Sequence, residues 1–195
     1  MSRNLSIVGI DPSLTGTGVA ELLLDSEDRW QVFRWHCPTK GTRRDTLDMR
    51  AARIGRITAD VMSWAPGADL VVVEGPAYAS TVGSLLDRYG LWWRIVYRLL
   101  AHDVPVAVCP PTVLKKFITG NGGAKKADVM DAVNAMWYPD VPITNDNEAD
   151  ALGLASIGAA ALGLPVPFRV TSDRSATLGN VEWPEDMEGL RDVVA

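Results

Sequence analysis

Five acidic residues stand where a site for chemistry could form. Asp11 ends the apolar run LSIVGID, Glu74 ends the run LVVVE, and a proline or a glycine follows directly. Acidic residues at the carboxyl ends of buried strands lie where α/β sheets place their sites. The stretch NDNEADALGLA then adds Asp146, Glu148 and Asp150 before it turns apolar. Each acid could be a turn or helix-capping residue, so the question is whether some of them meet.

The acidic stretch at residues 145–155 has the pattern of a helix start. Asn145 as the N-cap places Glu148 three residues later, in an arrangement that resembles a capping box and explains Glu148 structurally. Asp146 and Asp150 are four residues apart, so they lie on nearly the same helical face, where like charges destabilise a helix. A divalent cation bound by Asp146 and Asp150 would offset this repulsion. Mg²⁺ prefers oxygen ligands and is commonly held by one or two carboxylates plus substrate phosphates.

The composition is that of a globular protein without a membrane segment. Of the 195 residues, 47% are hydrophobic and 22% are charged. No apolar run reaches the roughly 18 residues of a membrane span, and the N-terminal apolar stretch is too short for a secretory signal. Cys37 and Cys109 form no CxxC pair, so neither a disulfide scaffold nor a thiolate zinc site is indicated. A cytoplasmic protein is expected, in a bacterial host cell if it is phage-encoded.

Clusters of basic residues could contact nucleic acid although the overall charge is negative. A net charge of −5 argues mildly against a nucleic-acid partner, but binding depends on how charges are distributed. The clusters could be solvated faces or contacts to a phosphate backbone. They comprise Arg43, Arg44, Arg50, Arg53 and Arg56, the pair Lys115 and Lys116, and the pair Lys125 and Lys126.

Periodicity predicts a mixed α/β fold. Apolar runs at residues 5–11, 19–24 and 30–35, joined by short polar turns, indicate an antiparallel three-strand meander. Helical spacing over about 44–64 and 82–101 brackets a strand at 69–75 that is apolar on both faces, as in the centre of a sheet. A strand at 104–109 and helices over 110–118, 125–137 and 146–162 follow. This order predicts an α/β protein with a mixed central sheet and helices on both faces.

The end of the chain lacks such a pattern. Residues from about 169 onward show no periodicity, and the stretch VEWPEDMEGLRD is strongly acidic. We therefore expect one domain over residues 1–165 and a loosely packed or partly disordered tail over 166–195.

Four motifs in order resemble the RuvC-type Holliday junction resolvases, especially phage-borne members. They are GIDPSLTGTGVA, VVVEGP, PPTVLKKFITGNGGAKKADVM and NDNEADALGLA. Each is weak alone, but their order and spacing over residues 5–162 are specific. The resemblance implies an RNase H-like fold, a homodimer, and nicking of branched DNA at a four-way junction with Mg²⁺, or Mn²⁺ as a substitute.

The resemblance also implies roles for individual residues. Asp11, Glu74 and Asp150 match the family's metal-binding acids, which would hold two ions that promote phosphodiester hydrolysis and leave 5′-phosphate ends. The position three before Asp150 is Asn147 rather than an acid. Asp146, four residues before, is the predicted fourth ligand, with Asn147 as a neutral alternative. Lys126 matches a basic residue near the scissile phosphate, with Lys125 as the close alternative.

Further residues are expected to contact DNA or a second copy of the chain. Tyr78 lies one residue away from an aromatic that bacterial members place after the central glutamate. It could stack on an unpaired base or pack in a loop. The aromatic stretch DRYGLWWRIVYRLL is either a dimer surface or core. The predicted backbone contacts are Arg43, Arg44, Arg50, Arg53, Lys115, Lys116 and Lys125.

Three other functions compete with this interpretation. A nucleotide-binding protein of the sugar-kinase and actin superfamily needs two domains, for which 195 residues leave no room, so no nucleotide cofactor is expected. An RNase H-type enzyme that cuts RNA–DNA hybrids would use similar acids. A non-catalytic junction-binding protein gains nothing from carboxylates near phosphates.

Overall fold

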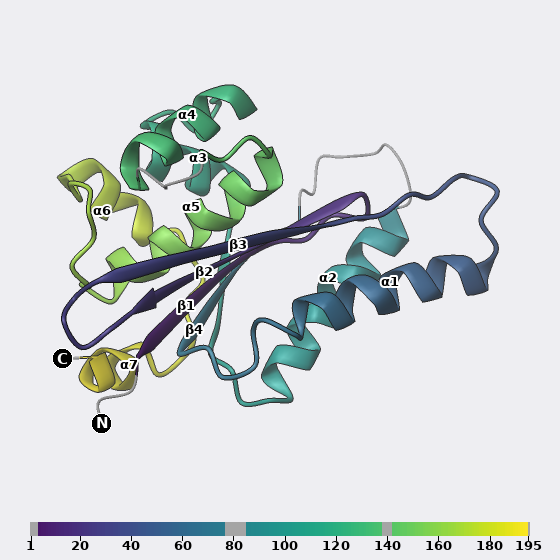
Figure 1. Ribbon diagram of the computed structural model, residues 1–195, viewed down its shortest axis with the longest axis horizontal. Helices are drawn as coiled ribbons and strands as arrows, with labels where there is room; N and C mark the ends of the chain where they lie inside the picture. The colour runs from purple at the N-terminus through teal and green to yellow at the C-terminus, as the bar shows by residue number, and fades with distance from the viewer. Residues whose placement is uncertain (1–3, 77–84, 138–141, 195) are drawn as a thin grey trace.

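A computed structural model describes residues 4–76, 85–137 and 142–194. The chain folds into a five-stranded sheet with helices on both faces (Figure 1). The strands are β1 (Leu5–Asp11), β2 (Gly16–Leu24), β3 (Trp30–Pro38), β4 (Leu70–Glu74) and β5 (Val106–Cys109). The helices are α1 (Leu47–Val61), α2 (Leu85–Leu100), α3 (Pro111–Thr119), α4 (Lys126–Trp137), α5 (Asp146–Ala161), α6 (Ser172–Leu178) and α7 (Met187–Val194).

The sheet is mixed, with the order β3-β2-β1-β4-β5. Strands β1, β2 and β3 form the predicted antiparallel meander, and β4 and β5 extend it in parallel with β1. Because β1 and β4 run in the same direction, their carboxyl ends lie at the same edge of the sheet. The topology therefore brings the strand-end acids Asp11 and Glu74 together.

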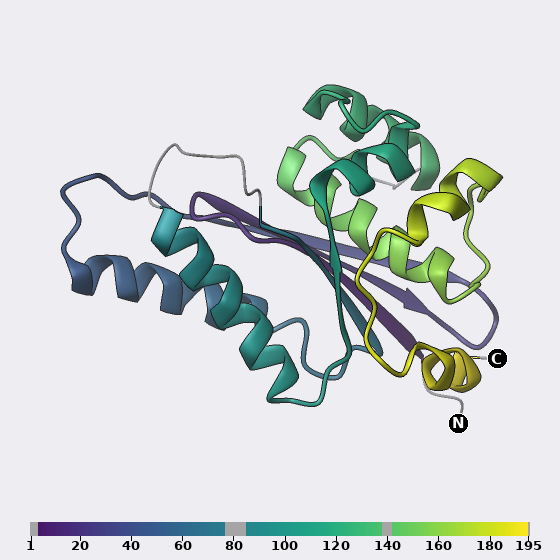
Figure 2. The same cartoon turned by 180° about the vertical axis from the view of Figure 1, so that it is seen from behind.

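Two hydrophobic cores lie on opposite faces of the sheet. The pleat sends alternate side chains to each face. Ile7, Leu22 and Val72 pack with α3, α4 and α5, whereas Val8, Ile10 and Val73 pack with α1 and α2. Figures 1 and 2 show α3–α6 on one side of the sheet and the α1–α2 pair on the other.

Helix α5 lies closest to the sheet and is buried nearly all round. Its small side chains allow the approach, and so does a glycine on β1. A Cβ atom at Gly9 would lie 1.9 Å from the carbonyl oxygen of Ala151 and 2.6 Å from the backbone nitrogen of Ala155. The backbone of α5 therefore rests directly on β1, which fixes the height of its acidic first turn above the sheet.

Replacing Gly9 with alanine should separate α5 from the sheet. Overpacking of this kind costs about 1–3 kcal/mol. Gly55→Ala is the matched control, because Gly55 lies within α1 with no atom within 4 Å of the added Cβ. That change should stabilise the protein by up to about 1 kcal/mol. Urea unfolding of the two variants checks this, and equal free energies of unfolding would contradict the packing described here.

The segment after residue 165 makes specific contacts, in contrast to the loosely packed tail expected there. The Arg174 guanidinium donates hydrogen bonds to the carbonyls of Phe117 (2.9 Å) and Ile118 (3.2 Å) at the end of α3. Glu182 pairs with Val108 on the outer edge of β5. The Arg191 side chain donates to the carbonyl oxygen of Ala161 at the end of α5. These contacts attach α6, α7 and the segment between them to the sheet and its helices.

None of the described helices is long and apolar enough to cross a membrane.

Candidate active site

Asp11 and Glu74 belong to one row of side chains that crosses the sheet. Asp11 is paired with Gly18 of β2, Gly18 with His36 of β3, and Glu74 with Cys109 of β5. Residues paired across strands point to the same face, and Cys109 belongs to the core beneath α5. The two acids therefore face the first turn of α5.

The first turn of α5 lies directly over the glycine of that row. The Asn145 side chain caps the helix by accepting hydrogen bonds from the backbone N–H groups of Asn147 (2.9 Å) and Glu148 (3.2 Å), so the predicted N-cap is confirmed. A Cβ at Gly18 would lie 2.0 Å from the carbonyl oxygen of Asn147. Gly18 thus lets α5 bring Asp150 down toward Asp11 and Glu74.

The three acids influence one another electrostatically. Burial and the nearby Glu74 and Asp150 charges raise the pKa of Asp11 well above its ordinary value. Burial and the Asp150 charge raise the pKa of Glu74 to about 7, and burial raises that of Asp150 to about 6. The hydrogen bond between Asp11 and Glu74 raises the pKa of Asp11 and lowers that of Glu74. These two directions are those expected when Asp11 is the donor and Glu74 the acceptor of the hydrogen bond.

These acids and two lysines line one cavity of about 340 Å³ at the edge of the sheet. Nearby Lys115 and Lys126 lower the pKa of Glu74, so their charges are felt at the carboxylates. The cavity thus combines buried acids with cations that could bind a phosphate. Its lining includes Asp11, Glu74, Asp150, Asn147, Lys115, Lys126, Arg88, Tyr89 and Trp92.

The predicted fourth ligand, Asp146, pairs with Lys126, which itself lines the cavity. Its carboxylate accepts a hydrogen bond from Lys126, which lowers the pKa of Asp146. Asn147, the neutral alternative, lines the cavity, whereas Asp146 is absent from its described lining. The rotation of α5 therefore directs Asn147 and Asp150 inward and leaves Asp146 beside Lys126.

Comparison with known proteins identifies the family. The chain is 30% identical over 158 residues to the crossover junction endodeoxyribonuclease RuvC of Prochlorococcus marinus, an alignment that covers 78% of this chain and 96% of the relative. The chain belongs to the RuvC family. RuvC of Sorangium cellulosum is 32% identical over 148 residues, which covers 69% of this chain and 80% of that protein. No family model matches.

Solved structures support the fold of this RuvC-family chain. The structure of Thermus thermophilus RuvC superposes with a TM-score of 0.63 at 20% identity and covers 84% of this chain and 100% of its own. The fowlpox virus Holliday junction resolvase superposes with a TM-score of 0.51 at 14% identity and covers 80% of this chain and 99% of its own. The predicted RNase H-like fold is therefore confirmed.

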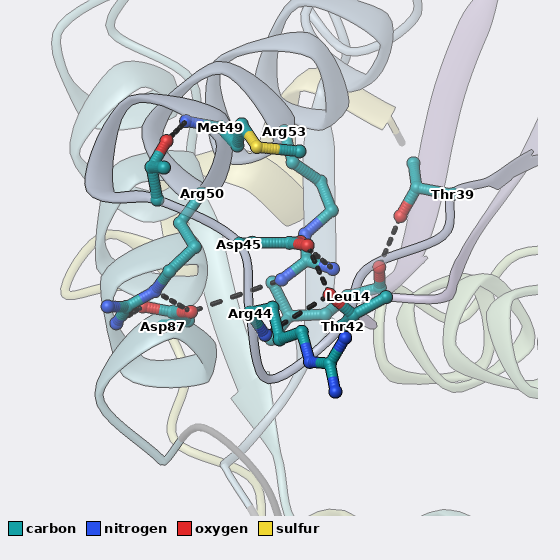
Figure 3. A network of polar contacts seen from close by, with 10 residues as sticks. Leu14, Thr39, Thr42, Arg44, Asp45, Met49, Arg50, Arg53 and Asp87 are labelled. Carbon is teal, nitrogen blue, oxygen red and sulfur yellow. Dashed lines mark hydrogen bonds and ion pairs between the residues drawn. The ribbon is translucent and has the colours of Figure 1, made fainter.

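Two of the arginines predicted to contact DNA serve an internal network (Figure 3). Arg50 and Arg53 of α1 both approach Asp87, a buried residue of α2. Arg50 Nε donates to Asp87 at 2.7 Å, and Arg53, whose side chain is 13% exposed, also pairs with Asp45. The two arginines therefore hold α1 against α2 and the preceding loop.

The remaining predicted DNA contacts differ in their exposure. Lys115 is partly buried in the cavity lining, and Tyr78 lies outside the described residues. The exposed cations among them are Arg43, Arg44, Lys116 and Lys125.

Two cavity residues were missed by the sequence reasoning. Arg88 and Tyr89 lie in the aromatic helix α2, which was interpreted only as dimer surface or core. Together with Leu85 and Trp92 they follow the spacing i, i+3, i+4 and i+7 of one helical face, and all four line the cavity. That periodicity was the available signal in the sequence. Trp92 also donates a hydrogen bond from its ring nitrogen to the carbonyl oxygen of Glu74 (2.9 Å).

The acids of the cavity suit a hard divalent ion by their chemistry. Carboxylate oxygens are the ligands that Mg²⁺ and Mn²⁺ prefer, and here burial and the charge of Asp150 raise the pKa of both Asp11 and Glu74. Among the described residues no three His, Cys, Asp or Glu side chains are already arranged as a metal site. Asp11 and Glu74 are instead hydrogen-bonded to each other, and a metal ion would take the place of that contact.

Proposed function

We propose that this chain is a RuvC-type endonuclease that nicks four-way DNA junctions by metal-dependent phosphodiester hydrolysis and leaves 5′-phosphate ends. One observation carries the proposal: Asp11, Glu74 and Asp150 line a single cavity with Lys115 and Lys126. Closely spaced acids beside cations are the arrangement expected at a site where metal ions and a phosphate bind together. The relatives named crossover junction endodeoxyribonucleases support the same substrate, and their bacterial origin supports action in bacterial cytoplasm.

Some residues of the cavity would bind the metal, and others would bind the phosphate. Asp11, Glu74 and Asp150 would hold Mg²⁺, or Mn²⁺ in its place, with Asn147 or Asp146 completing the ligands. The bound ions would supply an activated water and Lewis-acid charge at the scissile phosphate. Lys115 and Lys126 offset the phosphate's charge. The exposed Arg43, Arg44, Lys116 and Lys125 contact the DNA backbone, so affinity should fall steeply with salt.

A cleavage panel tests this function against its rivals. The substrates are a synthetic four-way junction, a fork, a flap, a linear duplex and an RNA–DNA hybrid, each incubated with Mg²⁺. We expect symmetric nicks in the junction that a ligase can reseal. Preferential cutting of the hybrid would support an RNase H-type enzyme instead, and binding of the junction without any cutting would support a non-catalytic protein.

The outer face of α2 is proposed as the homodimer surface. One face of the helix is core, through Leu91 and Ile95. The opposite side exposes Trp93 (61%) and Tyr97 (70%), together with Leu86 and Leu100. These four residues fall along the 3.5-residue seam by which helices pair. A dimer would present two cavities to the two strands of a junction.

Introducing a charge on this seam should separate the subunits. Trp93→Glu is expected to convert the dimer to a monomer in sedimentation velocity, because an unpaired carboxylate would be buried at the interface. Paired nicking of the junction should fall with it. Ala135→Glu, on the exposed surface of α4, is the matched control. A Trp93→Glu protein that still sediments as a dimer would show that the interface lies elsewhere.

A further inference from the structure

Glu148 makes contacts that a helix-capping role does not require. Its carboxylate lies 3.1 Å from Nε of Arg34 and 3.2 Å from Nδ1 of His36, both on β3. The Glu148 side chain is 18% exposed and that of Arg34 is 20% exposed. The free backbone N–H groups of the first turn are already served by Asn145. The acid therefore connects the start of α5 to the outer strand of the sheet.

The connection lies on the flank of α5 opposite to the catalytic acids. Residues advance by 100° around a helix, so Glu148 and Asp150 are about 200° apart. Asn147, over Gly18, faces the sheet between them. Glu148 points toward β3, and Asp150 points toward Asp11 and Glu74 on β1 and β4. The first turn of α5 thus straddles β2 with one acid on each side.

The contact between Glu148 and Arg34 opposes electrostatic repulsion within the cavity. Charges on Glu74 and Asp150 disfavour ionisation of the acids around them, so repulsion in the cavity acts to turn or lift the first turn of α5. On the other flank, the attraction between Glu148 and the guanidinium of Arg34 opposes that movement. Arg34 and Glu148 therefore form the charged part of this attachment.

We propose that Glu148 is a positioning residue: through Arg34 and His36 it sets the rotation of the first turn of α5, so that Asp150 and Asn147 face the cavity before metal or DNA binds. The proposal rests on the proposed function for the identity of the metal site. It differs from the proposed function because Glu148 itself would touch neither the metal nor the phosphate.

Direct metal binding without DNA tests the role. Mn²⁺ titrations monitored by calorimetry are compared for the parent, Glu148→Ala, Glu148→Gln and Arg34→Ala. Loss of an interaction that orients a ligand lowers metal affinity by about 10- to 100-fold, and we expect about tenfold for Glu148→Ala. The amide oxygen of glutamine can still accept from Arg34, so Glu148→Gln should recover part of the affinity. Asp48→Ala, an exposed acid in the first turn of α1, is the matched control and should bind Mn²⁺ like the parent.

The double variant Glu148→Ala/Arg34→Ala separates positioning from general destabilisation. If the two residues act as one attachment, it should bind Mn²⁺ no more weakly than either single variant. Parent-like affinity in folded Glu148→Ala, or an equal loss in Glu148→Gln and Glu148→Ala, would overturn the proposal. Failure of the junction-cutting function is recognised separately, because the cleavage panel then shows no cutting by the parent while the Mn²⁺ comparison still reports on Glu148.

Discussion

Asp11→Asn should lower the single-turnover rate of junction cutting by about 100- to 1,000-fold, the usual effect of removing one preorganised electrostatic group. Asp11 lines the cavity with Glu74 and Asp150, whose charges act on it. Asparagine has the same shape but cannot supply the negative oxygen that a divalent ion requires. Rates measured with labelled junction at saturating enzyme and Mg²⁺ give the result directly.

The same variant should remain folded and should still bind the junction. The asparagine amide can donate to Glu74 as the protonated acid does, so the contact between β1 and β4 is kept. The substitution adds no negative charge near the phosphate, so it does not weaken DNA binding electrostatically. Gel-shift affinity in Ca²⁺ or without metal should therefore equal or exceed that of the parent. Asp131→Asn, on the exposed face of α4, is the control. Cutting by Asp11→Asn within a fewfold of the parent rate would remove Asp11 from the metal site.

The acids of the site could be predicted from the sequence because their signals are local. Asp11 and Glu74 each end an apolar strand, and a parallel arrangement of β1 and β4 is enough to bring them together. Asp150 follows from the small-residue face after it, which lets α5 pack on the sheet. Each inference needs only a strand end or a helix face, and the structure places all three side chains in one cavity.

The DNA-contacting arginines were harder to predict because a cation's partner can be distant in sequence. Arg50 and Arg53 are separated from Asp87 by more than thirty residues, yet Asp87 is buried between α1 and α2 beside them. A helix face of arginines has the same pattern whether it meets phosphate or a buried carboxylate. Only the packing of α1 on α2 distinguishes the two.

Rotations and long-range contacts explain the remaining differences. The choice between Asp146 and Asn147 depends on how α5 is turned about its axis, which the glycines of β1 and β2 and the contacts of Glu148 determine. The C-terminal segment shows no clear periodicity because scattered hydrophobic side chains, such as Val181 and Trp183, and a few polar contacts attach it. Arg174 binds the end of α3 and Arg191 binds the end of α5, and neither contact leaves a repeating pattern in the sequence.

Metal binding should depend strongly on pH, because protons and divalent ions compete for the same oxygens. Without metal, the pKa of Glu74 is raised to about 7 and that of Asp150 to about 6, and Asp11 is also raised. Below pH 6 Glu74 is largely protonated and Asp150 is at least half protonated, so an ion must displace protons. Mn²⁺ affinity should therefore rise with pH between about 5.5 and 7.5, by up to tenfold per pH unit for each proton displaced.

Calorimetry in buffers of different ionisation enthalpy measures both the affinity and the protons released. We expect more protons released per Mn²⁺ at pH 6 than at pH 8. Asp150→Asn removes one titrating acid, so its affinity should be lower and its pH dependence shallower. Constant affinity and no proton release across this range would contradict the raised pKa values of Glu74 and Asp150.

The stability of the metal-free protein should show the opposite trend over the same range. An acid whose pKa is higher in the folded than in the unfolded chain binds more protons when folded, so its contribution to stability is lost as pH rises through the folded value. For Glu74 that loss falls between the ordinary value of 4.5 and about 7. Burial and the charge of Asp150 cause this loss, and a bound divalent ion would neutralise the charged acids. Mn²⁺ should therefore raise the midpoint of thermal unfolding much more at pH 8 than at pH 5.5, and Asp11→Asn, which lacks one of the metal-binding carboxylates, should show a smaller difference between the two pH values.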